Sequence, residues 1–69
     1  MATLKELRYK AHLTIAELAR LAGIDRKTVE RAEAGVAISD LKAYQILEVL
    51  REKLDTGIKI SDIDGLNVR

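Results

Sequence analysis

Apolar residues recur three and four positions apart in four stretches of the chain, as one face of an α-helix requires. A Ser, Thr or Asp that can cap a helix precedes each stretch. The pattern therefore predicts helices at about residues 4–11, 15–22, 26–34 and 40–54, and Ser61 as a cap predicts a short fifth helix at about residues 61–65. Because proline is absent and good helix formers are abundant, we expect an all-α fold.

The chain is organised around residues 13–35, which predict two short helices joined by a tight turn. Thr14 precedes the first apolar run and Glu17 follows three residues later, which is the spacing of a capping box. Gly23 follows that run and can adopt the left-handed conformation that ends a helix. The expected buried face of this helix consists of Leu18, Ala19, Leu21 and Ala22.

The second helix of this pair follows Asp25, a good N-cap, and Gly35 is expected to end it. Val29 and Ala32 are expected to face inward. Two helices this short pack closely only if a small side chain lies where they cross, and Ala19 supplies one. The outer face of the second helix is predicted to carry Arg26, Lys27, Glu30 and Arg31.

The charges on this outer face have two interpretations. Lys27 and Arg31 lie four residues apart, a like-charge pair that costs a few tenths of a kcal/mol in an isolated helix. A bound phosphate backbone would turn that repulsion into attraction. Glu30, within one turn of Arg26 and Lys27, equally allows a solvated surface of mixed charge. Charge alone therefore leaves both interpretations open.

The first helix of the chain carries a similar cap. Thr3 followed by Glu6 is a second capping-box pair, and Leu4, Leu7 and Ala11 give the helix its apolar face. Its charged side chains, expected to be exposed, are Lys5, Arg8 and Lys10.

The long fourth helix, capped by Ser39, is more apolar than a single buried face requires. Its buried stripe is expected to consist of Leu41, Leu47, Leu50 and Leu54. The apolar side chains that widen this stripe are Ala43, Tyr44, Ile46 and Val49. Either a second copy of the protein or the carboxy-terminal segment could cover them, and the sequence favours neither.

The carboxy-terminal segment begins with residues 58–60, which alternate like a short extended piece. Ser61 is then expected to cap a final helical turn that ends at Gly65. Asp62 and Asp64 fit the acidic first turn of such a helix better than a cation site, because no further ligands lie near them in sequence.

Composition narrows the class of protein. The chain has 69 residues, enough for one domain (residues 1–69), and contains no Cys. It lacks an apolar run long enough to span a membrane and a signal-peptide pattern, so we expect a soluble, cytoplasmic protein. The net charge is only +1, so nucleic-acid binding would require the basic groups to gather on one face.

The chain shows no Ser–His–acid or Cys–His set, no metal-ligand cluster and no Gly-rich phosphate loop. We therefore expect no enzyme, no cofactor and no metal site, and assign no chemistry to the lone His12.

The sequence resembles the XRE type of helix-turn-helix, the class of the lambda-like phage repressors and Cro proteins. The resemblance spans about residues 3–54 and implies a compact five-helix, all-α DNA-binding domain of the lambda repressor-like kind. The residues that carry it are Leu4 to Arg8, Leu13, Thr14, Glu17, Leu18, Ala19, Leu21, Ala22, Gly23, Ile24, Thr28, Val29, Glu33, Gly35 and Leu41.

The resemblance also implies roles for particular residues in a transcriptional regulator, expected to be a repressor that binds inverted repeats of double-stranded DNA as a homodimer. The residues expected to contact bases are Arg26, Lys27, Thr28 and Arg31. Those expected to contact phosphates are Thr14, Ile15, Arg20 and Arg8. Those expected at the dimer interface are Ala43, Ile46, Val49 and Ile63.

The chain departs from this family pattern at three places. Ile15 stands where many relatives have a Gln, and Ala32 is smaller than the usual Ile or Leu. The segment after Gly35 lacks the Lys or Arg often found there. These departures lower the expected DNA affinity, so the alternative is a protein-interaction or antitoxin-like regulatory module whose long fourth helix binds another polypeptide.

Overall fold

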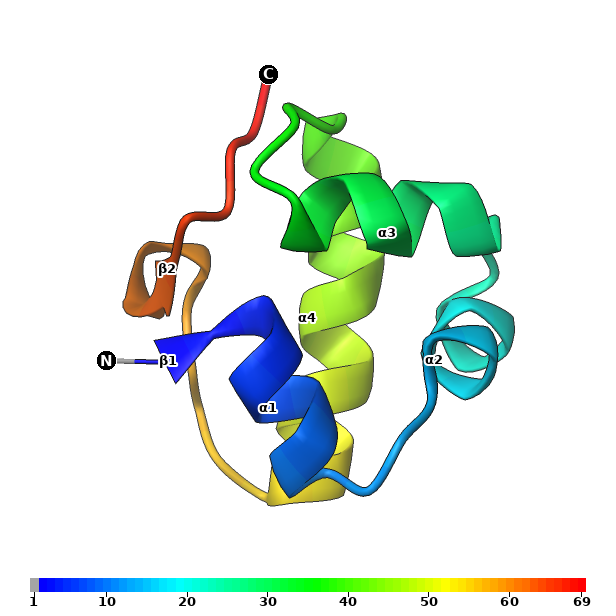
Figure 1. Ribbon diagram of the computed structural model, residues 1–69. Coiled ribbons are helices and arrows are strands. Elements are labelled where there is room, and N and C mark those ends of the chain that lie inside the picture. Colours follow the sequence, from blue (N-terminus) through cyan, green and yellow to red (C-terminus); the bar gives the residue numbers. More distant parts are fainter. Residues whose placement is uncertain (1) are drawn as a thin grey trace.

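Four α-helices surround one apolar core in the computed structural model, which describes residues 2–69 (Figure 1). In chain order, the elements are β1 (Ala2–Thr3), α1 (Leu4–Lys10), α2 (Ile15–Ala22), α3 (Arg26–Glu33), α4 (Asp40–Leu54), a 3₁₀ turn (Ile60–Asp62) and β2 (Ile63–Asp64). In this part of the chain, no helix combines the length and the apolar character needed to cross a bilayer.

The bounds of the four helices follow the sequence pattern closely. Helices α2 and α4 begin and end at the predicted residues, while α1 and α3 each end one residue earlier than predicted. At the start of α2, the Thr14 hydroxyl accepts from the Glu17 N–H at 3.1 Å, and the Thr14 N–H donates to the Glu17 carboxylate at 2.9 Å. Thr3 and Glu6 form the same capping box on α1, so both predicted boxes are confirmed.

The predicted fifth helix over residues 61–65 is wrong. A single 3₁₀ turn occupies Ile60–Asp62, and the chain then extends as β2, which pairs in parallel with β1. Asp62 accepts from the Lys59 N–H at 2.9 Å, so the N-cap position is Lys59, two residues before the predicted cap at Ser61. So short a segment gains little from helical hydrogen bonds, whereas the extended form buries Ile63 against the core.

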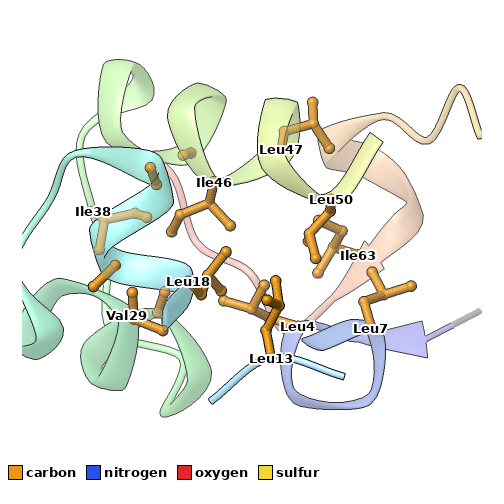
Figure 2. Close-up of a cluster of buried hydrophobic side chains, with 14 residues drawn as sticks. Leu4, Leu7, Leu13, Leu18, Val29, Ile38, Ile46, Leu47, Leu50 and Ile63 are labelled. Atoms are coloured by element: carbon orange, nitrogen blue, oxygen red, sulfur yellow. The ribbon is translucent and has the colours of Figure 1, made fainter. Parts of the chain in front are cut away.

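The core lies between α4 and the other three helices (Figure 2). It is aliphatic, and Leu18, Val29, Ile46 and Leu50 within it are completely buried. Ala19 is buried too, on α2, which packs against both α3 and α4. The small side chain at this position therefore lies inside the packed motif, as the sequence predicted.

Two leucines expected in the core are at the surface instead. Leu41 is 68% exposed in the first turn of α4, and Leu21 is 43% exposed near the end of α2. Both lie at the margin of an apolar face. A domain this small buries only part of its apolar surface, so side chains at such a margin stay exposed.

The carboxy-terminal segment packs against the core to which α4 contributes. Ile63 is buried, and Ile58, Ile60, Leu66 and Val68 pack against the core beside it. The last residues then run along the loop between α3 and α4, where Val68 pairs in parallel with Ile38 (Figure 1).

Candidate nucleic-acid interface

The candidate interface is the outer face of α3. Arg26, Lys27, Glu30 and Arg31 are exposed on this helix, while Val29 and Ala32 anchor it in the core. Gly23, in the left-handed conformation with φ 73°, turns the chain from α2 into α3. Asp25 takes the N-cap position, but its side chain makes no capping hydrogen bond, contrary to expectation.

The cations of this face are free of ion pairs. Residues 2–69 contain two ion pairs, Arg8–Glu33 and Arg51–Glu48, and neither involves Arg26, Lys27 or Arg31. Glu30 lies on the same face, yet it neutralises none of these cations by a direct contact. The outer face of α3 therefore presents three positive charges to the solvent.

Thr28 was expected to contact a base, but its side chain is buried with Val29 on the inner face of α3. Position 28 is one turn before Ala32 on the buried side of the helix, so the hydroxyl has no path to a base edge. Thr28 is therefore not positioned to contact a base.

The amino end of α2 lies next to the amino end of α3. Between them and the end of α1 is a shallow groove of about 550 Å³, which Thr14, Ile15, Ala16, Tyr9 and Arg26 help to line. The Thr14 hydroxyl is used in the capping box, but the first backbone N–H groups of a helix have no intrahelical acceptor. The N–H groups of Ile15 and Ala16 thus remain able to bind an anion here.

The capping box also fixes the charge of Glu17. Its carboxylate accepts the Thr14 N–H and is close to the Thr14 hydroxyl, and these hydrogen bonds lower the pKa of Glu17 below its usual value. Glu17 is therefore ionised at neutral pH. Arg20 is exposed in the last turn of the same helix, where it offers a further cation for a phosphate.

Arg8, expected to contact a phosphate, is instead a buried structural residue with 6% exposure. Its Nε and a terminal nitrogen donate to the Glu33 carboxylate at 2.6 and 3.3 Å, and its other terminal nitrogen donates to the Leu13 carbonyl at 3.0 Å. Hydrogen bonding to Glu33 raises the pKa of Arg8. The expectation is wrong because the guanidinium is already engaged by the protein.

A signal in the sequence could have revealed this role. Position 8 completes the three- and four-residue spacing of the buried face of α1, and position 33 lies four residues after Val29 on the buried face of α3. A positive and a negative charge at buried positions of two helices suggest an ion pair. The pair joins α1, the α1–α2 connection and the end of α3.

Three of the four residues expected at the dimer interface are inside the molecule. Ala43, Ile46 and Ile63 are buried by the chain itself and have no surface to offer a second copy. Val49 is partly exposed and helps to line a groove between α2 and α4 that also includes Leu21 and Tyr44. The exposed apolar side chains of α4 are thus those of Tyr44 and Leu41.

Comparison with known proteins identifies the family to which these four helices belong. A family model described as helix-turn-helix matches residues 4–56, which is most of the chain and includes all four α-helices. Searches of curated proteins and of solved structures found no match. The chain therefore belongs to the helix-turn-helix family, and within it to the XRE type.

Proposed function

We propose that the protein binds double-stranded DNA with sequence specificity and regulates transcription, with α3 lying in the major groove. The observation that carries this proposal is the outer face of α3, where Arg26, Lys27 and Arg31 are exposed and unpaired on a helix anchored by its other side. Arg and Lys side chains suit the O6 and N7 acceptors of guanine. Residues near the amino end of such a helix reach base edges first.

The amino end of α2 supports the same proposal. Its free N–H groups at Ile15 and Ala16 are suited to a backbone phosphate, and Arg26 lines the groove that they share. We propose that this end of α2 and Arg20 contact phosphates while α3 reads the bases. Phosphate contacts of this kind would fix the position of α3 along the duplex.

We further propose that the protein acts as a repressor and binds an inverted repeat as a homodimer. A single domain of this size with three exposed recognition cations makes few contacts, and a two-fold dimer doubles them. Leu41 and Tyr44 lie three residues apart on the exposed side of α4 and supply the apolar surface for such a contact.

The experiment that tests this function is selection of bound sequences from a random duplex pool, followed by a salt titration with the best sequence. We expect one enriched motif with two-fold symmetry. The logarithm of the affinity should fall linearly with the logarithm of the salt concentration, because phosphate binding releases counterions.

Absence of any binding at low salt would overturn the proposal. The second candidate, a protein-interaction module, would then explain the groove that Leu21, Tyr44 and Val49 help to line. The apolar residues that first favoured this candidate, Ala43 and Ile46, give it no support because they are completely buried.

A further inference from the structure

The carboxy-terminal end of the chain is attached to the loop that follows α3. The Ile38 N–H donates to the Asn67 carbonyl at 3.0 Å, and the Arg69 N–H donates to the Ile38 carbonyl at 2.9 Å. The Asn67 side-chain amide also donates to the Gly35 carbonyl. Residues 67–69 are therefore held at this loop by three hydrogen bonds, although more than thirty positions separate Asn67 from Gly35 in sequence.

This loop is hydrogen-bonded in turn to the last turn of α3. The Val36 N–H donates to the carbonyl of Arg31 at 2.9 Å, and Arg31 is the last of the three exposed cations of that helix. Figure 1 shows the carboxy terminus beside the α3–α4 loop, at the end of α3 away from α2. The tertiary structure thus brings Arg69 close to the carboxy-terminal end of α3.

Besides Arg31 in the last turn of α3, Arg69 brings a positive charge to this end of the helix. The loop itself, residues 34–38, consists of Ala, Gly, Val, Ala and Ile and carries no charged side chain. The side chain of Arg69 is exposed and takes part in neither of the two ion pairs among residues 2–69. Its guanidinium is free to bind an anion outside the molecule.

A helix in the major groove has a phosphate backbone on each side. An eight-residue helix such as α3 is about 12 Å long, close to the width of about 12 Å of the groove itself. Both ends of α3 therefore come within reach of a backbone. The amino end of α2 lies at one end of α3, and the loop that carries Arg69 lies at the other.

We propose that Arg69 contacts a DNA phosphate at the end of α3 away from α2, and that Asn67 positions it by holding the chain against the loop. This inference rests on the proposed DNA-binding function. In this proposal the carboxy-terminal segment supplies the cation for this phosphate, because residues 35–38 contain no charged side chain. A phosphate contact fixes position without reading sequence, so Arg69 should strengthen binding to every duplex about equally.

The test compares the wild-type protein with Arg69→Ala on the selected duplex and on a random duplex across a salt series. We expect Arg69→Ala to weaken binding about three- to tenfold on both duplexes. The slope of log affinity against log salt should fall by about one. Arg69→Lys, which keeps the charge, should restore most of the slope.

Lys59→Ala is the matched control, because Lys59 is an exposed cation just before the 3₁₀ turn and outside the proposed surface. It should leave the salt slope unchanged. An Arg69→Ala protein with wild-type affinity and slope would overturn the inference while leaving DNA binding intact. A wild-type protein that binds no duplex would overturn both, so the two failures are distinguishable.

Discussion

At the residue scale, Arg8 and Arg26 show that one side-chain type can serve opposite purposes in one small molecule. Arg8 is buried and fully engaged with Glu33 and the Leu13 carbonyl, whereas Arg26 is exposed without an ion pair. The difference comes from the face of the helix on which each lies. An arginine on a buried face requires partners from its own protein, while one on an exposed face can bind a ligand.

Arg8→Met should lower the free energy of unfolding by about 3–5 kcal/mol, because it leaves the carboxylate of Glu33 buried without its partner. The double variant Arg8→Met/Glu33→Met should recover most of this loss, since it removes both charges. Urea denaturation followed by circular dichroism measures both. A loss below about 1 kcal/mol for the single variant, the range of an exposed pair, would contradict the structural role.

Arg26→Ala should reduce affinity for the selected duplex by about 1–3 kcal/mol and relax the preference at one base pair, if the guanidinium makes a bidentate contact with guanine. Repeating the sequence selection with the variant measures both effects. Lys59→Ala, which removes one exposed charge elsewhere, should retain the original motif. An unchanged motif and affinity for Arg26→Ala would show that this side chain does not read the DNA.

At the element scale, local signals were sufficient for the helices that have both a cap and an apolar face. Thr14 with Glu17 and Thr3 with Glu6 define where α2 and α1 begin, and Gly23 defines where α2 ends. The predicted helix at residues 61–65 also had a capping residue, Ser61, but a helix of this length is too short for one cap to stabilise it. There the pairing of Ile63 with Ala2, remote in sequence, determined the structure.

The two capping boxes should make stability depend on acid pH. Hydrogen bonds from the backbone N–H groups of Thr3 and Thr14 lower the pKa values of Glu6 and Glu17 below 4.5 in the folded state. The stability that they contribute is therefore fully present well above the usual pKa of a glutamate and is lost as the pH falls through the lowered pKa values.

Glu6→Gln/Glu17→Gln keeps an acceptor for each cap but removes its titration. We expect this variant to lose less stability than the wild type between pH 5 and pH 3 in thermal melts. Glu52→Gln, an exposed glutamate outside both caps, serves as the control. Equal acid dependence of stability in the wild type and the double variant would show that folding does not change the pKa values of these two carboxylates.

At the scale of the whole molecule, the tertiary structure decided how the apolar excess of α4 is used. The sequence allowed either a second copy or the carboxy-terminal segment to cover Ala43 and Ile46. The carboxy-terminal segment packs against the core, and both residues are buried within one chain. The surface left for a dimer contact has therefore moved to Leu41 and Tyr44, which are 68% and 51% exposed.

Leu41→Ser should weaken self-association if the proposed dimer forms through this side of α4, because it removes apolar surface from the contact. Sedimentation velocity over a concentration series should show a dimer for the wild type and a monomer for the variant. Tyr9→Ser, which changes an exposed aromatic residue on α1, should still form the dimer. Identical sedimentation of wild type and Leu41→Ser would place any dimer contact elsewhere.

The sequence by itself determined the four α-helices, the side-chain caps of α1, α2 and α4, the turn at Gly23 and the exposed face of α3, because hydrogen bonds and apolar spacing within a few residues decide these features. The tertiary structure alone decided that Arg8 meets Glu33, that residues 63–64 pair with β1 and that Arg69 lies beside Ile38. Each of these contacts joins positions at least 25 residues apart, where the gain from burial and pairing appears only once the whole chain has folded.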